Sequence, residues 1–245
     1  MTREWDAAAY ERLSAPQTRW GQLVVDRLEL TGNERVLDAG CGTGRVTAML
    51  LDRLPNGRVI GLDGSAAMIE QAGVRFAGEP RVELLVADLI EPLPLDGRVD
   101  AILSTATFHW IADHASLFRN LASALRPGGQ LVAQCGGAGN ISSLEEIIAQ
   151  LGHTFADGKT FATAEETRAR LEAAGFDNIE TWLHEEPTTL PQEDLEAFLE
   201  TVCLGGIVDG MSEEERERFV NEVADRLPEP RIDYVRLNIT ARRSS

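Results

Sequence analysis

The sequence predicts an α/β fold built around a doubly wound, mostly parallel β-sheet. Short apolar runs alternate with segments of helical periodicity through the first half of the chain. The runs consist largely of Val, Leu and Ile, which is typical of strands that helices cover on both faces. The first run leads directly into a glycine-rich turn. Strands and helices that alternate in this way form a parallel sheet with crossover helices.

The apolar runs predict five strands. They lie at residues 35–39, 58–63, 82–88, 99–105 and 130–134. Helical spacing predicts helices at residues 44–54, 65–76 and 114–129. The last of these helices carries Leu117, Leu121 and Leu125 on one face, and the Pro-Gly-Gly run at 127–129 should end it.

Further helices are predicted on either side of this core. Residues 17–30 carry an apolar stripe that would pack on the sheet. The stripe consists of Trp20, Leu23, Val24 and Leu28. Two capping-box pairs, Thr163 with Glu166 and Ser212 with Glu215, mark the beginnings of later helices.

The last third of the chain predicts two more strands. Residues 175–186 and 231–242 have strand character, and we expect them to form a hairpin at the edge of the sheet. The whole chain, residues 1–245, is expected to be one domain. Its parts are an N-terminal helical cap at 1–30, a core at 31–140, a helical insert or lid with an edge strand at 141–215, and the last helix and terminal strand at 216–245.

Composition and charge restrict the function. The chain has 245 residues, 43% of them hydrophobic, without a signal peptide or a membrane-spanning run, so we expect a cytoplasmic protein. The net charge of −17 and a single lysine argue against DNA, RNA or a membrane as partner and leave a small-molecule substrate. Cys41, Cys135 and Cys203 have no paired spacing, so neither a disulfide nor a metal site is predicted.

The segment VLDAGCGTG, residues 36–44, contains most of the first predicted strand with an acid, Asp38, and then three glycines in five positions. The turn after the first strand of such a sheet is a usual ligand site, and Gly40 and Gly42 let the backbone approach a ligand closely. Arg45 stands where a dinucleotide fingerprint needs a third glycine. Asp38 would repel a pyrophosphate but attract a sulfonium and an ammonium group. S-adenosylmethionine carries both.

Two more acids follow successive strands. Asp63 ends the second predicted strand, where a carboxylate can accept hydrogen bonds from ribose hydroxyls. Asp88 ends the third, where a carboxylate can accept from an adenine amino group. Each aspartate alone is equally compatible with a helix N-cap. One acid after each of three strands favours a nucleoside that carries positive charge.

Together these stretches resemble the class I, Rossmann-like S-adenosylmethionine-dependent methyltransferases. VLDAGCGTG, VIGLDGSAAMIEQA, VADLIEPLP and LRPGGQLVAQ occur in the family's order over roughly residues 5–140. The resemblance implies a seven-stranded sheet with a terminal antiparallel hairpin, and S-adenosylmethionine as the cofactor. The residues it implies are Asp38, Gly40 and Gly42 for the methionine part, Asp63, Gly64 and Met68 for ribose and adenine, Asp88 and Leu89 for the base edge, and Ser104 after the fourth strand.

Two other stretches resemble small-molecule carboxyl methyltransferases of the trans-aconitate and juvenile hormone acid type. They are YERLSAPQTRW at 10–20 and FHWIADH at 108–114. This resemblance implies that Gln17 and Trp110 orient the substrate carboxylate. Tyr10 would close over the cofactor or, alternatively, pack the first helix. The bland alternatives are that Trp110 packs in the core or a lid and that Gln17 is a solvated helix residue.

The chemistry of a carboxylate acceptor is simple, because a carboxylate is ionised at neutral pH and needs no general base. An alcohol, phenol or amine acceptor would need one, and His109 is the candidate for O-, N- or C-methylation of such a metabolite. The alternative is that His109 is a positioned or structural histidine. Two other functions remain open at this point. They are an NAD-dependent oxidoreductase on the same fold and a cofactor-binding module without activity.

Overall fold

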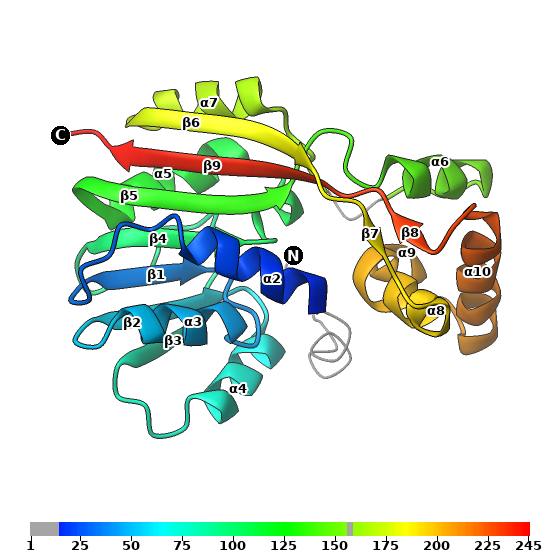
Figure 1. The fold of residues 1–245 in the computed structure, drawn as a ribbon, viewed down its shortest axis with the longest axis horizontal. Coiled ribbons are helices and arrows are strands. Elements are labelled where there is room, and N and C mark those ends of the chain that lie inside the picture. Colours follow the sequence, from blue (N-terminus) through cyan, green and yellow to red (C-terminus); the bar gives the residue numbers. More distant parts are fainter. Residues whose placement is uncertain (1–14, 156–158) are drawn as a thin grey trace.

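Seven strands form one central sheet in the computed structural model, which describes residues 15–155 and 159–245, with side chains from residue 20 onward (Figure 1). The order across the sheet is β3-β2-β1-β4-β5-β9-β6. Strands β1 to β5 run parallel, and β9 is antiparallel to both β5 and β6. The predicted parallel sheet with a terminal antiparallel hairpin is confirmed. Its strands are β1 (Arg35–Ala39), β2 (Arg58–Asp63), β3 (Val82–Val86), β4 (Val99–Thr105), β5 (Leu125–Gly136), β6 (Phe176–Glu185) and β9 (Val235–Arg243).

Helices cover both faces of the sheet, with α2 and α3 on one side and α5 and α7 on the other (Figure 1). Successive residues of a strand point to opposite faces. Val36 and Leu103 are therefore buried with α2 and α3, whereas Leu37 and Ile102 are buried with α5 and α7. The helices that flank the sheet are α2 (Ala15–Val25), α3 (Arg45–Arg53), α4 (Ala66–Arg75), α5 (His114–Ala124) and α7 (Ala164–Ala173). Both predicted capping boxes are confirmed, at the starts of α7 and of α10 (Glu213–Arg226).

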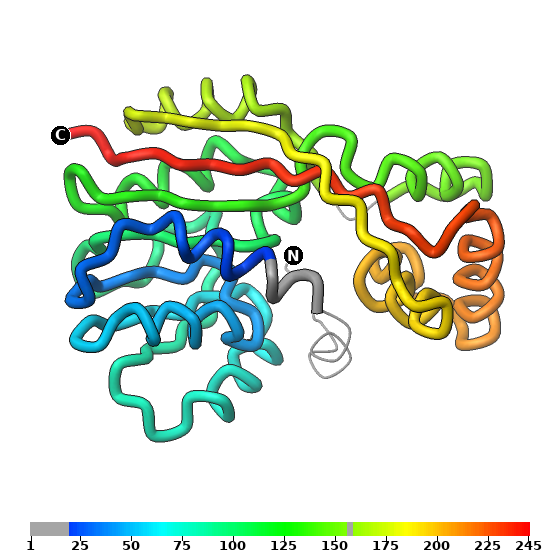
Figure 2. The backbone as a smooth tube through the Cα atoms, viewed as in Figure 1, coloured from blue at the N-terminus to red at the C-terminus, as the bar shows by residue number. Residues whose placement is uncertain are grey.

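A helical lobe lies beyond the carboxyl ends of the parallel strands (Figure 1). It has its own apolar core, to which Trp20 of α2 and Tyr234 also contribute. A short second sheet, β7 (Thr188–Thr189) with β8 (Arg231–Ile232), continues the β6–β9 hairpin into the lobe, as the tube in Figure 2 shows. The helical elements of the lobe are α6 (Ser142–Gln150), η2 (Gln192–Asp194), α8 (Leu195–Phe198), η3 (Leu199–Cys203), α9 (Gly205–Val208) and α10 (Glu213–Arg226). The lobe thus combines α6, α8 and α9 with α10, most of which lies beyond the predicted insert at 141–215.

Several predicted boundaries differ from the structure, and two of them concern how strands of the sheet begin or end. The helix predicted over 114–129 ends at Ala124, and Leu125 begins β5 because it pairs with Val99 of β4. The third strand ends at Val86, so that Asp88 lies in the loop that follows it. Tertiary pairing decides both boundaries, since periodicity alone does not show where a helix gives way to a strand.

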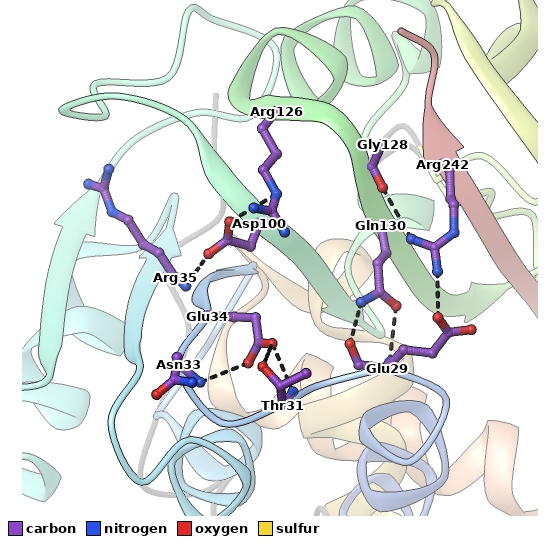
Figure 3. Close-up of polar contacts among 10 residues, drawn as sticks. All are labelled: Glu29, Thr31, Asn33, Glu34, Arg35, Asp100, Arg126, Gly128, Gln130 and Arg242. Carbon is purple, nitrogen blue, oxygen red and sulfur yellow. Dashed lines mark hydrogen bonds and ion pairs between the residues drawn. The ribbon is translucent and has the colours of Figure 1, made fainter.

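A polar network closes the end of the sheet opposite the lobe (Figure 3). The Asp100 carboxylate accepts a hydrogen bond from the Arg35 backbone N–H at 2.7 Å and pairs with Nε of Arg126 at 3.0 Å. The Gln130 side chain donates to the Glu29 carbonyl at 2.8 Å and accepts from the Glu29 N–H at 3.0 Å. These contacts fix the loop after α2 against the amino ends of the strands.

No helix in the described part of the chain is long and apolar enough to cross a membrane. Over the same residues, no group of three or more His, Cys, Asp or Glu side chains is arranged to hold a metal ion. Cys41, Cys135 and Cys203 are buried free thiols.

Candidate active site

The glycine-rich turn is bound to the end of the neighbouring strand β2. The backbone N–H groups of Gly40 and Cys41 donate to the Leu62 carbonyl at 2.7 and 3.0 Å. The Asp63 carboxylate accepts from the Gly42 N–H and from the Ser65 N–H, both at 2.9 Å. Asp63 therefore holds the turn and the start of α4 in place while it faces the space between them.

Gly40 and Gly42 have different surroundings. Gly40 has a φ of 80°, and a Cβ atom there would lie 2.1 Å from Oγ1 of Thr107, just beyond β4. At Gly42, with a φ of 54°, nothing lies within 4 Å of the Cβ position. Gly40 is required for the close approach of Thr107, whereas Gly42 leaves open space at the carboxyl end of β1.

A cavity of about 470 Å³ opens between the carboxyl ends of the parallel strands and the helical lobe. That volume lies in the range of small-molecule sites, roughly 300–1,000 Å³. One end of the cavity is formed by the turns after β1, β2 and β3. The other end is formed by the η1 turn (Phe108–Trp110), by the segment before α7 and by residues of the lobe and of β9.

Most of the residues predicted from the sequence line this cavity. They are Gly40, Gly42, Asp63, Gly64, Met68, Asp88, Leu89, His109 and Trp110. Tyr10 lies outside the described residues. Gln17 belongs to α2, but its side chain is outside the described part of the structure.

Asp38 and Ser104 are buried and do not line the cavity, and their contact with a ligand stays a prediction. Asp38 lies on the same face of β1 as Val36, beneath α3, where Thr47 donates a 2.7 Å hydrogen bond to its Oδ2. Ser104 is buried and donates to the Ala39 carbonyl at 2.6 Å. Through these hydrogen bonds, Asp38 connects β1 to α3 and Ser104 connects β4 to β1.

Burial raises the pKa of Asp38 to about 7. The hydrogen bond from Thr47 partly opposes this shift, and the charge of Asp63 adds to it. Oδ1 of Asp38 is buried and has no hydrogen-bond partner among the described residues. The sequence predicted that a negative charge at this position attracts the cofactor, and a pKa of about 7 leaves that carboxyl group partly protonated at neutral pH.

His109 is the central polar residue at the lobe end of the cavity. Its Nδ1 accepts a hydrogen bond from the Gly136 backbone N–H at 3.3 Å, and its ring stacks on Phe161. Burial lowers the pKa of His109 well below its ordinary value, and the charges of Arg236 and Lys159 lower it further. The imidazole is therefore neutral, and because Nδ1 is an acceptor, its proton lies on Nε2.

Two cationic side chains at the same end were not predicted from the sequence. The Lys159 ammonium lies 4.6 Å from the centre of the Trp110 ring and donates to the Cys203 carbonyl at 3.2 Å. The Arg236 guanidinium lies 4.4 Å from the centre of the Trp20 ring. The sequence offered one indication that Lys159 is special, since it is the single lysine of the chain. Arg236 carried no signal, because it lies among the alternating polar residues of β9 that a sequence pattern assigns to solvent.

Comparisons with known proteins define the class. A family model described as a methyltransferase domain matches residues 36–129. Trans-aconitate 2-methyltransferase of Methylobacterium nodulans is 34% identical over 183 residues, which cover 74% of this chain and 67% of that protein. The enzyme of the same name from Acidovorax ebreus is 37% identical over 131 residues, which cover 54% of this chain and 49% of that protein. The chain thus spans about half the length of the first curated relatives it matches.

Solved structures agree on the fold. Phosphoethanolamine N-methyltransferase 2 of Haemonchus contortus, in complex with phosphomonomethylethanolamine and S-adenosylhomocysteine, has a TM-score of 0.66 at 21% identity. That alignment covers 98% of this chain and 57% of the other. The sheet topology, the glycine turn and these matches define an S-adenosylmethionine-dependent methyltransferase of the Rossmann-like type. The chain belongs to the class I S-adenosylmethionine-dependent methyltransferases, and among curated proteins it is similar to trans-aconitate 2-methyltransferases.

Proposed function

We propose that this protein transfers the methyl group of S-adenosylmethionine to a carboxylate oxygen of a small-molecule acid. Asp63 and Asp88 line the cavity near the glycine turn, and neutral donors and cations line it at the lobe, where Asp113 follows the η1 turn. The relatives named trans-aconitate 2-methyltransferase support an acid as the acceptor. A nicotinamide-dependent oxidoreductase is not favoured, because the family is a methyltransferase family.

The residues at the acidic end fit the cofactor. The open space at Gly42 would admit it to the turn, and Asp63 and Asp88 both line the cavity with carboxylates that can accept hydroxyl and amino hydrogens. Met68 and Leu89 offer apolar surface for a base. When bound, S-adenosylmethionine would supply the methyl group to be transferred.

The hydrogen bond from the Gly136 N–H to Nδ1 of His109 is the observation that carries the choice of acceptor. An alcohol, phenol or amine acceptor must lose a proton, and Nε2 of His109 already holds one. A carboxylate needs no base and instead needs donors that fix one oxygen in line with the methyl group. The Nε2–H of His109 is a neutral donor of this kind, and Trp110 brings an indole N–H to the cavity lining.

Gln17 remains part of the proposal as a third neutral donor, carried by α2. Neutral donors suit a nucleophile, because a close ion pair with a cation would stabilise the carboxylate before it reacts. The lobe encloses the acceptor end and would reduce the access of water to the reacting groups.

The experiment is incubation of the protein with methyl-labelled S-adenosylmethionine and a panel of acids, amines and phenols that includes trans-aconitate. We expect label in an acid, as an ester that alkali hydrolyses, by mass spectrometry. Label only in amines or phenols would contradict the carboxylate proposal. If no acceptor supports cofactor turnover while S-adenosylhomocysteine still binds normally, the result would favour a binding module without activity.

The variant Trp110→Phe tests the donor role at the same site. We expect unchanged affinity for S-adenosylhomocysteine and a turnover lower by about tenfold, the effect of losing one hydrogen bond of roughly 1.5 kcal/mol. Trp182→Phe is the matched control, since Trp182 lies on the edge strand β6 and does not line the cavity. Equal turnover in both variants would remove the indole from the proposed mechanism.

A further inference from the structure

The backbone just beyond the carboxyl end of β4 takes a left-handed conformation at Ala106. Its φ is 54°, in the region that favours glycine because a Cβ atom is strained there. Among the residues that the structure describes, two others that are not glycine have a positive φ, Ile141 at 55° and Asn178 at 47°. Asparagine adopts this conformation readily, so the strained positions are Ala106 and Ile141. Both line the cavity.

The two strained residues differ in what their side chains contribute to the fold. Ile141 belongs to the apolar core of the lobe, so its side chain has a packing role. Ala106 is half-buried and is not a member of any of the three apolar cores that the described residues form. Glycine at this position would relieve the backbone and would leave no gap in a core. The methyl group of Ala106 therefore serves the cavity wall and not the packing of the fold.

Ala106 lies at the boundary between the two ends of the cavity. Its N–H donates a hydrogen bond to the Gln134 carbonyl of β5 at 2.7 Å. The next residue, Thr107, lies against Gly40 of the glycine turn, and its hydroxyl donates to the Gly40 carbonyl at 3.3 Å. Strand β4 itself lies between β1 and β5. Ala106 is thus placed between the turn where the cofactor is expected and the η1 turn, which begins two residues later.

We propose that the methyl group of Ala106 is a wall against which the acceptor lies during methyl transfer, and that it determines how bulky an acceptor can be next to its reacting carboxylate. This inference rests on the proposed carboxylate methylation. In-line transfer needs the acceptor oxygen at roughly 3–3.5 Å from the methyl carbon and in one direction. His109 and Trp110 orient the carboxylate through neutral donors, and the wall prevents the rest of the acceptor from moving sideways.

An apolar group suits this position at the boundary. A methyl group makes no hydrogen bond, so it does not compete with His109 or Trp110 for the carboxylate. It also occupies space that water would otherwise fill beside the reacting groups. In an apolar pocket, one methylene group of the substrate changes kcat/KM by about 10- to 200-fold. A single methyl group of the protein is therefore enough to separate a branched acid from an unbranched one.

The test compares acids that differ by one methyl group on the carbon next to the carboxylate. The pairs are butyrate with 2-methylbutyrate, glutarate with 2-methylglutarate, and phenylacetate with 2-phenylpropionate, each with methyl-labelled S-adenosylmethionine. For the wild-type protein we expect kcat/KM to be higher for the unbranched acid by about tenfold or more. In Ala106→Gly the ratio should shrink to within about threefold, because glycine leaves the space of one methyl group. Equal ratios in the two proteins would overturn the proposal.

Two further variants show whether the ratio depends on the wall. Ala106→Ser keeps the Cβ atom and adds an oxygen atom to it, so its ratio should be larger than that of the wild type by about threefold or more. Asn178→Gly is the matched control, because Asn178 also has a positive φ but lies on β6 and does not line the cavity. It should keep the wild-type ratio. A general loss of activity leaves the ratio within a pair unchanged.

Stability and cofactor binding separate a missing wall from a loosened turn. Ala106→Gly should unfold at a temperature equal to or above that of the wild type, because glycine relieves the left-handed backbone. Its affinity for S-adenosylhomocysteine should stay within about threefold, whereas a turn loosened at Gly40 would weaken that affinity. A changed ratio that occurs only with weakened affinity would overturn the proposal.

The remaining outcomes are decided by the same measurements. If Ala106→Gly fails to fold, Ala106→Ser decides, and an unchanged ratio in that variant would overturn the proposal. Methylation of acids with the same ratio in every variant would remove this inference but keep the proposed function. Methylation of no acid at all, by the wild type or by any variant, would remove both.

Discussion

The backbone N–H of Gly136, at the end of β5, donates a hydrogen bond to Nδ1 of His109, 3.3 Å away in the η1 turn. This contact joins the strand end to the acceptor end of the cavity, and it determines which ring nitrogen carries the proton. With Nδ1 as an acceptor, the proton of this possible base lies on Nε2. Four predictions follow from this and related contacts.

The first prediction concerns His109 itself. His109→Gln keeps an N–H donor on a planar group, whereas His109→Leu does not, so we expect turnover to fall further in the leucine variant, by about another tenfold. Because the pKa of His109 is lowered well below its ordinary value, the imidazole stays neutral from about pH 6.5 upward. The ratio of wild-type to glutamine-variant kcat/KM should therefore be constant over that range. A ratio that falls as the pH is lowered would show that His109 titrates and acts as a base.

The second prediction concerns Gly42. Alanine at this position meets no atom within 4 Å, but its Cβ would occupy open space at the cavity. We expect Gly42→Ala to weaken binding of S-adenosylhomocysteine at least tenfold, measured by calorimetry. Gly128→Ala is the matched control, because Gly128 also has a positive φ, 75°, and open space, but lies in β5 away from the cavity. Both variants should lose about 1–2 kcal/mol of stability from the left-handed backbone, and the control should bind normally.

Asp63 gives the third prediction. Both of its oxygens accept backbone N–H groups, from Gly42 and from Ser65. In Asp63→Asn the amide NH₂ would face one of these donors, so the turn should open. We expect affinity for S-adenosylhomocysteine to fall by roughly 10- to 100-fold, in line with about 1.5–3 kcal/mol for a hydrogen bond to a charged group. Asp52→Asn, on the exposed side of α3, should bind as the wild type does. Equal affinities in the two variants would contradict this role.

The fourth prediction is the pH dependence that Asp38 contributes to stability. Its pKa is about 7 in the folded protein, against about 3.9 in an unfolded chain. The folded state therefore binds this proton more tightly, and the contribution of Asp38 to stability falls as the pH rises from 4 to 7. At pH 8 the buried carboxylate is ionised and destabilises the fold, by a shift of about three pKa units, or roughly 4 kcal/mol at most.

Asp38→Asn should accordingly stabilise the protein more at pH 8 than at pH 5, measured by urea unfolding at both values. Thr47→Val tests the same group in the opposite direction. Removal of the hydroxyl donor raises the pKa of Asp38 further, so this variant should be destabilised more at pH 8 than at pH 5. The same change at both pH values for both variants would show that Asp38 does not titrate in this range.

The cofactor end could be predicted from the sequence because its signals are local. The strand before Asp38, the glycines after it and the acid at the end of β2 each occupy a fixed place along a regular βα unit. In a parallel sheet the carboxyl ends of the strands meet at one edge, so Asp63 and Asp88 were expected to lie together there, and both line the cavity. The terminal hairpin was predicted from the strand character of residues 175–186 and 231–242 and agrees with what the family resemblance implies.

The acceptor end could not be predicted, because its residues are brought together from distant segments. Lys159 precedes α7, Arg236 lies on β9 and Trp20 lies on α2. The alternation of β9 separates apolar from polar residues but does not show that the lobe and α2 cover the polar side. Asn238 on that side is fully buried, as Arg236 nearly is.

The sequence by itself determined the parallel sheet, its hairpin and the turn that marks the cofactor, because strand periodicity and glycine geometry act over a few neighbouring residues. Tertiary structure alone decided the ionisation and donor roles. The burial and the charges around a side chain depend on the elements that pack against it. Packing of α3 over β1 raises the pKa of Asp38, and the hydrogen bond from Gly136 of β5 makes Nδ1 of His109 an acceptor.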